Sequence, residues 1–237
     1  MTGGSSGIGA ATAHRLAEAG AFVVVGYHAG RERAEAVVSG LPGHGHTTLP
    51  MPMHDSAALL EAAKAVKRGF GRVDVLVNSA GTTKSIPHHD LDGLTDEIFD
   101  EIYAVNVRGP FATVRAFRAL LEHSQDAVVV NISSISASTG SGSSVAYCAS
   151  KAALDTMGRS LARALAPTIR FVSVSPAAVD TGFVPGRAAR ALLAHAESAP
   201  LKVVADPDDV AVAVLGAVTH LRLATGTEIV VDAGKHL

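Results

Sequence analysis

A tyrosine and a lysine four positions apart could transfer a proton in this chain. Tyr147 and Lys151 lie in YCASK, within a helix predicted over Ser144–Ala166. Because residues i and i+4 share a helix face, the phenol and the ammonium group point into the same space. The positive charge favours the phenolate and lowers the tyrosine pKa from about 10 toward neutral pH. Ser134, at the end of a strand predicted over Ala127–Ser133, would present its hydroxyl at the ligand-binding edge of a sheet.

A glycine-rich turn, TGGSSGIG over residues 2–9, could bind the phosphates of a dinucleotide. Glycines let the backbone turn sharply and approach a pyrophosphate, and the N-terminus of the next predicted helix, Ile8–Ala19, offers free N–H groups. A flexible Gly/Ser turn is the alternative interpretation. The strand predicted over Ala21–Tyr27 follows after about a dozen residues, as a βαβ dinucleotide unit requires. A YxxxK pair alone is common on protein surfaces, but with Ser134 and this turn it indicates nucleotide-dependent chemistry at a carbonyl or alcohol.

Short apolar runs alternate with longer helical patterns along the chain. The predicted strands are Ala21–Tyr27, Thr47–Met53, Val73–Asn78, Ala127–Ser133, Ile169–Ser175 and Thr227–Asp232. The predicted helices are Ile8–Ala19, Arg31–Val38, Ser56–Lys67, Thr95–Leu121, Ser144–Ala166 and Asp206–Leu221. Asp55 or Ser56 and Thr95 are the expected caps of two of these helices. This alternation predicts an α/β fold: a doubly wound, Rossmann-type parallel sheet flanked by helices on both faces, in a single domain over residues 1–237. Only Met1 precedes the glycine turn, so we expect the first strand to be missing from this sequence, through a truncated or misassigned start.

The choice of cofactor depends on the residues that follow the strand over Ala21–Tyr27. An acidic residue there would bond the ribose hydroxyls of NAD and repel a 2′-phosphate. The chain has no acid there and instead places His28, Arg31 and Arg33 close to the strand end. Cations can pair with a phosphate, so we predict NADP, with NAD possible. The alternative places both arginines on the solvated face of the next helix.

Taken together, these motifs resemble the short-chain dehydrogenase/reductase family over essentially the whole chain. The matching segments, in the family's order, are TGGSSGIG (2–9), VDVLVNSAG (73–81), the asparagine of AVNVRGP (Asn106), NISS (131–134), YCASK (147–151), SPAAVDT (175–181) and TGTEIVVDAG (225–234). The resemblance implies an NAD(P)-dependent oxidoreductase, nearest to the 3-oxoacyl-(acyl carrier protein) reductase type. The chain departs from the family pattern at Ser79, at Pro176-Ala177, in VDAG, and at Pro52, where an acidic residue often lies near the adenine.

The same resemblance implies individual roles. Tyr147 would be the general acid/base, and Ser134 would orient the carbonyl oxygen. Lys151 would bind the nicotinamide ribose and lower the tyrosine pKa, while Asn106 would complete a water-linked proton relay through Lys151. The expected cofactor contacts run from the phosphates through the adenosine to the nicotinamide: Gly3, Ser5, Ser6, Gly7, Ile8, Gly9, Tyr27, His28, Arg31, Met53, Asn78, Ala80, Gly81, Tyr147, Lys151, Pro176, Val179 and Thr181.

A substrate lid is expected around residues 182–205, after the last cofactor segment. An apolar inner face on this lid would suit an acyl chain or another apolar carbonyl compound. An ordinary amphipathic helix that packs on its own domain is the alternative. The residues behind this prediction are Phe183, Val184, Leu192, Leu193 and Leu201, with Arg187 and Arg190 between them.

Composition and charge argue against several classes of function. The formal net charge of -2 gives no basic field for nucleic acid, and no apolar run reaches the roughly 18 residues of a membrane helix. The single cysteine, Cys148, fits a reducing cytoplasm and is expected to be a small buried thiol rather than a nucleophile. Five loop histidines lack the pair spacing of metal ligands, so no metal site is predicted; they are His44, His46, His54, His88 and His89.

Two long predicted helices, Thr95–Leu121 and Ser144–Ala166, carry many small and apolar residues. They could simply pack on the sheet, but the resemblance implies dimer and tetramer interfaces, so we predict a homo-oligomer. The predicted partner of the site is a small-molecule carbonyl or alcohol. The leading hypothesis is an NADPH-dependent ketone or 3-oxoacyl reductase. A nucleotide-binding regulatory protein that has lost catalysis is one alternative, and an NAD-dependent catabolic alcohol dehydrogenase is another.

Overall fold

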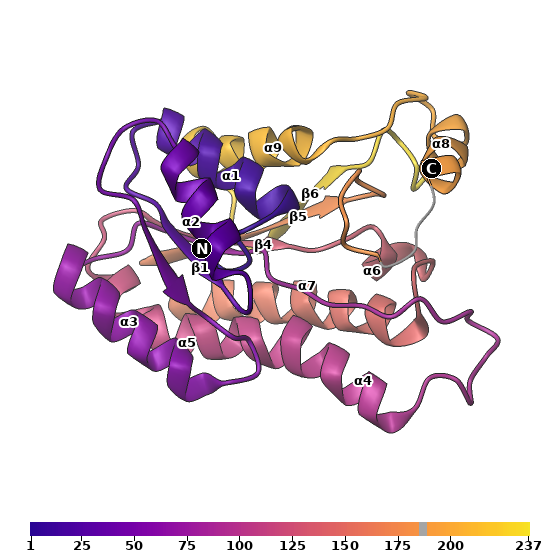
Figure 1. Ribbon diagram of the computed structural model, residues 1–237, viewed down its shortest axis with the longest axis horizontal. Coiled ribbons are helices and arrows are strands. Elements are labelled where there is room, and N and C mark those ends of the chain that lie inside the picture. The colour runs from indigo at the N-terminus through magenta and orange to yellow at the C-terminus, as the bar shows by residue number, and fades with distance from the viewer. Residues whose placement is uncertain (185–188) are drawn as a thin grey trace.

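Parallel strands form the middle layer of the protein, seen here in a computed structural model that describes residues 1–184 and 189–237 (Figure 1). Two of the strands pair with each other, β1 (Val24–Tyr27) and β2 (Thr47–Pro50). Four more pair in chain order: β3 (Val75–Asn78), β4 (Ala127–Ile132), β5 (Ile169–Pro176) and β6 (Thr227–Val231). Every pairing is parallel, which confirms the predicted fold class.

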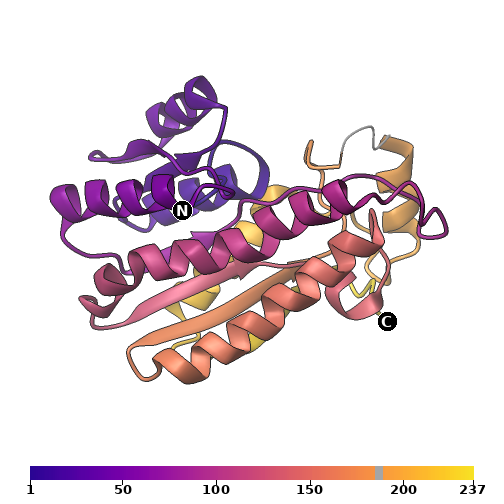
Figure 2. The ribbon, with the colours of Figure 1, turned by 90° about the horizontal axis from the view of Figure 1, so that it is seen from below.

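Helices cover both faces of the strands (Figure 2). One face carries α1 (Gly7–Glu18), α2 (Arg31–Gly40) and α9 (Pro207–Thr219), and the other carries α3 (Ser56–Phe70), α5 (Gly109–Glu122) and α7 (Val145–Leu165). Successive residues of β4 serve the two faces in turn, since Val130 packs in the apolar cluster of the first face and Val129 in that of the second. Both valines are fully buried, as expected of a central parallel strand.

Residues Met1 and Thr2 lie between β1 and β3. The N–H of Gly26 donates to the carbonyl of Met1 at 2.8 Å, and the N–H of Thr2 donates to the carbonyl of Val77 at 2.9 Å. Thr2 also forms an isolated parallel bridge with Asn78. The glycine-rich turn therefore starts at the carboxyl ends of two strands, where α/β sheets bind their ligands.

The helix predicted over Thr95–Leu121 is wrong as a single α-helix. It divides into α4 (Asp96–Tyr103), a π-helical segment η1 (Ala104–Arg108) and α5. Pro110, in the first turn of α5, has no N–H, so it cannot donate to the carbonyl of Asn106 four residues earlier. The N–H of Gly109 donates to the carbonyl of Ala104, five residues earlier, which is the π-helical pattern.

Other element ends follow from local chemistry. The N-caps predicted from the sequence are present: Asp55 accepts from Ala57 and Ala58, and Thr95 accepts from Ile98. The strand predicted to run to Met53 ends at Pro50, although the N–H of Met51 still donates to the carbonyl of Tyr27 at 2.7 Å. The short helix α6 (Ser136–Thr139) was not predicted, and α8 (Ala189–Glu197) lies within residues 182–205, where an amphipathic helix was the alternative to a lid. Among the helices of the described residues, none has the length and hydropathy needed to cross a membrane.

Candidate active site

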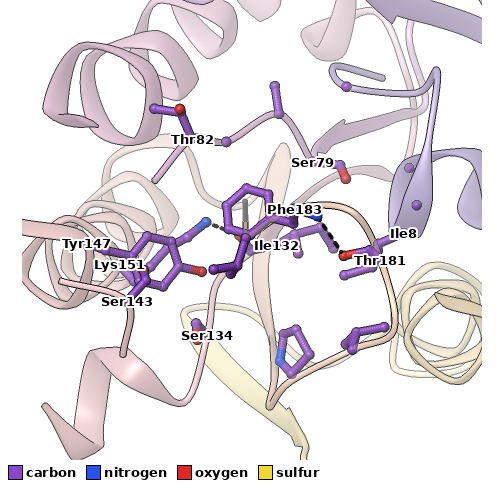
Figure 3. Close-up of a pocket in the computed structure, with 18 of the residues that line it drawn as sticks. Ile8, Ser79, Thr82, Ile132, Ser134, Ser143, Tyr147, Lys151, Thr181 and Phe183 are labelled. Atoms are coloured by element: carbon purple, nitrogen blue, oxygen red, sulfur yellow. Dashed lines mark hydrogen bonds between the residues drawn. The ribbon is translucent and has the colours of Figure 1, made fainter. Parts of the chain in front are cut away.

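Ser134, Tyr147 and Lys151 line one cavity of about 1460 Å³ at the carboxyl end of β4 (Figure 3). Ser134 follows β4, and its hydroxyl oxygen accepts from the N–H of Ser136 at 3.1 Å. Tyr147 lies in the first turn of α7, where its N–H donates to the Ser144 N-cap at 3.2 Å. The end of β4 and the first part of α7 therefore bring together Ser134, Tyr147 and Lys151, the three residues that the sequence predicted to act together.

Lys151 is the buried cation of the site. Its Nζ donates to the carbonyl of Ile132 at 2.8 Å and lies 5.7 Å from the centroid of the Tyr147 ring. Burial lowers the Lys151 pKa to about 8, against a smaller opposing effect of the Asp155 carboxylate one helical turn later. The pKa of Asp155 is itself raised by burial. Below about pH 8 the ammonium form predominates beside the phenol, where it favours the phenolate.

Asn106 is buried outside the cavity lining and braces the loop after β3. Its Oδ1 accepts from the N–H of Thr82 at 2.8 Å, and its Nδ2 donates to the carbonyl of Thr82 at 2.9 Å and to the hydroxyl of Ser150 at 3.0 Å. The side chain therefore ties this loop to α7, next to Lys151. Its backbone carbonyl is the one that Pro110 leaves without an α-helical donor.

The glycine-rich turn has the shape that a pyrophosphate needs. A Cβ on Gly9 would lie 2.1 Å from the carbonyl oxygen of Gly3, and a Cβ on Gly3 would lie 2.7 Å from the backbone of Ala80. Gly7 has a φ of +50°, in the left-handed region that favours glycine. The N-cap of α1, Ser6, makes no side-chain cap hydrogen bond. A backbone this close to the cavity, at a helix N-terminus, fits the phosphates of a dinucleotide.

The adenosine end of the cavity differs in part from the sequence prediction. Its lining includes the predicted His28, Met53, Ala80 and Gly81, and adds Arg33 and His54. The structure does not bring Tyr27, Arg31 or Asn78 into the lining. Arg31 is exposed and pairs with Glu35 at 2.8 Å, and Asn78 is buried with its Nδ2 donating to Asn131. His54 was missed because only the fold brings it beside His28.

Pro176, Val179 and Thr181 line the cavity beyond the glycine turn, as the resemblance implied. The aromatic ring of Phe183 lies with its centroid 5.9 Å from that of Tyr147, tilted by 53° (Figure 3). The N–H of Phe183 donates to the Thr181 hydroxyl at 3.3 Å. Phe183 is therefore the apolar lid residue placed against the phenol.

The apolar residues of the predicted lid differ in where they lie. Val184 lines the cavity, as do Ala191 and His195 from the same segment. Leu193 and Leu201 are 58% and 70% exposed, and Leu192 is not part of the cavity lining. Arg187 lies outside the described residues. Elsewhere near the substrate end the lining contains Ser141, Ser143, Glu101 and Lys235, which no sequence motif had indicated.

Cys148 is buried beside Tyr147, and burial raises the pKa of its thiol. This is the environment of an unreactive thiol, in line with the sequence prediction. No group of three His, Cys, Asp or Glu side chains within residues 1–184 and 189–237 could hold a metal ion.

Known proteins share this fold and these motifs. The chain matches a family described as enoyl-(acyl carrier protein) reductase over residues 3–236. It superposes with a TM-score of 0.91 and 34% identity on a short chain dehydrogenase from Burkholderia cenocepacia J2315 in complex with NADP, covering 100% of this chain and 96% of the other. The protein belongs to the short-chain dehydrogenase/reductase family.

Other members of the short-chain dehydrogenase/reductase family are similarly close. The granaticin polyketide synthase putative ketoacyl reductase 2 of Streptomyces violaceoruber is 37% identical, with 100% of this chain and 95% of that protein covered. A 3-ketoacyl-(acyl-carrier-protein) reductase from Brucella melitensis complexed with NADH gives a TM-score of 0.90 at 29% identity, with 100% and 96% covered. This member of the family is accordingly an NAD(P)-dependent oxidoreductase that acts on CH–OH groups.

Proposed function

We propose that this protein is an NADPH-dependent reductase of ketones, including 3-oxoacyl compounds, and that residues 1–237 form a single nucleotide-binding domain. The observation that carries the proposal is the shared cavity, in which Ser134, Tyr147 and Lys151 face the same space as the glycine-rich turn. A nucleotide site next to a proton donor is what a carbonyl reductase requires.

In the proposed reaction each polar residue acts at a defined atom. The hydroxyl of Tyr147 donates its proton to the carbonyl oxygen, and the hydroxyl of Ser134 donates a hydrogen bond to the same oxygen. The ammonium of Lys151 favours the phenolate that remains and supports the ribose of the nicotinamide. Bound NADPH supplies the hydride to the carbonyl carbon. Asn106 acts indirectly. It completes a water-linked relay through Lys151, and this relay returns a proton to Tyr147.

The proposed cofactor contacts follow the cavity lining. Gly3, Gly7 and Gly9, with their neighbours in the turn, would bind the pyrophosphate. Arg33 takes the role that the sequence offered to Arg31, because Arg33 lines the cavity while Arg31 pairs with Glu35. A guanidinium at the adenosine end favours the 2′-phosphate of NADPH over the hydroxyl of NADH. The relative from Burkholderia cenocepacia, solved with NADP, supports this choice.

Replacing the proposed acid tests the reaction directly. We expect Tyr147→Phe to lose about three orders of magnitude in turnover of a 3-oxoacyl thioester, within the usual range of general acid catalysis, while NADPH binding stays nearly unchanged. Tyr103→Phe is the matched control, because Tyr103 stacks on Phe99 outside the cavity lining. Turnover would be followed through NADPH absorbance, and binding through fluorescence titration.

Two results would redirect the proposal. Substantial turnover by Tyr147→Phe would remove the tyrosine from its role. Tight NADPH binding by the wild-type protein, without turnover of any ketone, 3-oxoacyl thioester or alcohol tested, would favour the nucleotide-binding regulatory protein instead.

A homo-oligomer, a dimer or tetramer, is the state we propose in solution. Phe99 of α4 and Phe111 of α5 are 36% and 42% exposed, and Val145 at the start of α7 is 40% exposed. Apolar side chains on these helices are suited to contacts between copies. Light scattering after size exclusion would test this assembly. We also propose a cytoplasmic location, on the basis of the single, buried Cys148.

A further inference from the structure

Two histidines from different strand ends meet at the adenosine end of the cavity. His28 directly follows β1, and His54 comes four residues after β2. Because β1 and β2 are parallel neighbours, their carboxyl ends lie side by side. The two rings are 5.0 Å apart between centroids at an interplanar angle of 78°. Both residues are exposed and both line the cavity.

Two arginines near this pair come from α2 and η1. Arg33 of α2 curls over Gly30, where a Cβ would lie 2.5 Å from its Nη2. Arg108 of η1 donates from both Nη atoms to the carbonyl of His54, at 3.3 and 3.4 Å.

Two acids of the adjoining segments, Asp55 and Glu35, have other partners. One carboxylate oxygen of Asp55 accepts from two N–H groups of the first turn of α3, and Glu35 pairs with Arg31. In the described part of the chain, this corner of the cavity therefore offers one guanidinium, Arg33, and two imidazoles to an anion.

We propose that His28 and His54 form a titratable clamp for the 2′-phosphate of the cofactor, so that the preference for NADPH over NADH increases as the pH falls from about 8 to about 6.5. The clamp rests on the proposed use of NADPH. It adds a second recognition residue, His54, and a pH dependence that a site built from arginine alone would lack.

The physical basis is proton uptake on binding. Histidine is the side chain whose ordinary pKa, near 6.5, lies within this pH window. A phosphate dianion beside the ring pair favours the imidazolium form and gains charge-assisted hydrogen bonds when a ring is protonated. The second pKa of a phosphate monoester, near 6, sets the lower limit of this window. NADH carries a hydroxyl at the same position and lacks this coupling.

Calorimetric titration of the whole chain with NADPH and with NADH, at about pH 8 and about pH 6.5, tests the clamp. We expect NADPH affinity to rise about tenfold across this range, as uptake of close to one proton requires, and NADH affinity to stay within about twofold. Repeating the titration in buffers of different ionisation enthalpy measures the proton uptake itself.

Three variants assign the effect to residues. We expect His28→Gln and His54→Gln each to reduce the pH dependence of NADPH binding, and the double variant to remove it. His89→Gln is the control, since His89 is exposed and outside the cavity lining; it should behave as the wild type. Unfolding curves would show that each variant is folded before titration.

The outcomes separate the clamp from the proposed function. NADPH binding that is tighter than NADH binding but equally independent of pH, or that keeps its pH dependence in the double variant, overturns the clamp and leaves NADPH use standing. Tighter binding of NADH, or no binding of either nucleotide, overturns both proposals.

Discussion

At the scale of a single residue, the buried charge of Lys151 lowers the stability of the folded protein. Its pKa falls from 10.5 to about 8 on burial. At about 1.4 kcal/mol for each pH unit, holding the charge in the folded state costs about 3 kcal/mol near pH 7. The folded pKa lies below the unfolded one, so between these values the unfolded chain binds more protons and stability rises with pH. The protein keeps an unfavourable buried charge at the position where the proposed reaction requires a cation.

Lys151→Met should therefore be inactive but more stable than the wild type at pH 7. We expect a gain of about 2 kcal/mol in the free energy of unfolding. This is less than the full cost of burying the charge, because the variant leaves the carbonyl of Ile132 without its hydrogen bond. The gain should shrink as the pH rises from 8 toward 10, which urea unfolding at several pH values would measure. Lys64→Met is the control: Lys64 is exposed, so its effect should be small and nearly constant with pH. A variant less stable than the wild type at pH 7 would contradict this account.

At the scale of the element, the glycine-rich turn leads into α1 and packs against the loop after β3. Gly9→Ala would place a Cβ 2.1 Å from the carbonyl oxygen of Gly3, so the turn must shift. We expect it to lose more than about 2 kcal/mol of stability and most dinucleotide binding. Gly216→Ala, in α9 with nothing within 4 Å of the new Cβ, should instead gain up to about 1 kcal/mol. Melting curves and NADPH titration of both variants test the contrast, and unchanged binding by Gly9→Ala would refute the role of the turn.

At the scale of the whole molecule, the cavity spans the carboxyl ends of both groups of strands. Residues that follow β1, β3, β4 and β5 all line it, so a bound dinucleotide contacts the two-stranded and the four-stranded part together. We expect NADPH at about 100 times its Kd to add about 2.7 kcal/mol to the free energy of unfolding and about 8 °C to the Tm. NADH at the same concentration should add less. A shift that is equal for the two nucleotides, or larger with NADH, would argue against the proposed preference.

The parts of the fold that the sequence predicted well are those set by local patterns. Near-continuous apolar runs such as the one in β4 identified the buried strands, because a strand covered on both faces has no polar side. Caps such as Asp55 and Thr95 gave helix starts correctly, since a cap bonds only its own first turn. The break between α4 and α5 was missed although Pro110 signalled it, because the helical periodicity continues across the π-helical segment.

By itself, the sequence determined which residues would share one cavity: Ser134, Tyr147, Lys151 and the glycine-rich turn. Tyr147 and Lys151 share a helix face through their spacing alone, and the glycines of the turn reveal a close approach of backbone. Only the tertiary structure decided which side chains complete the cavity. In the folded protein Arg33 lines the cavity and Arg31 does not. The ring of Phe183 lies beside that of Tyr147, and the ring of His28 lies beside that of His54. These are contacts between segments distant in sequence, and their direction depends on how strands and helices pack rather than on the residues beside them.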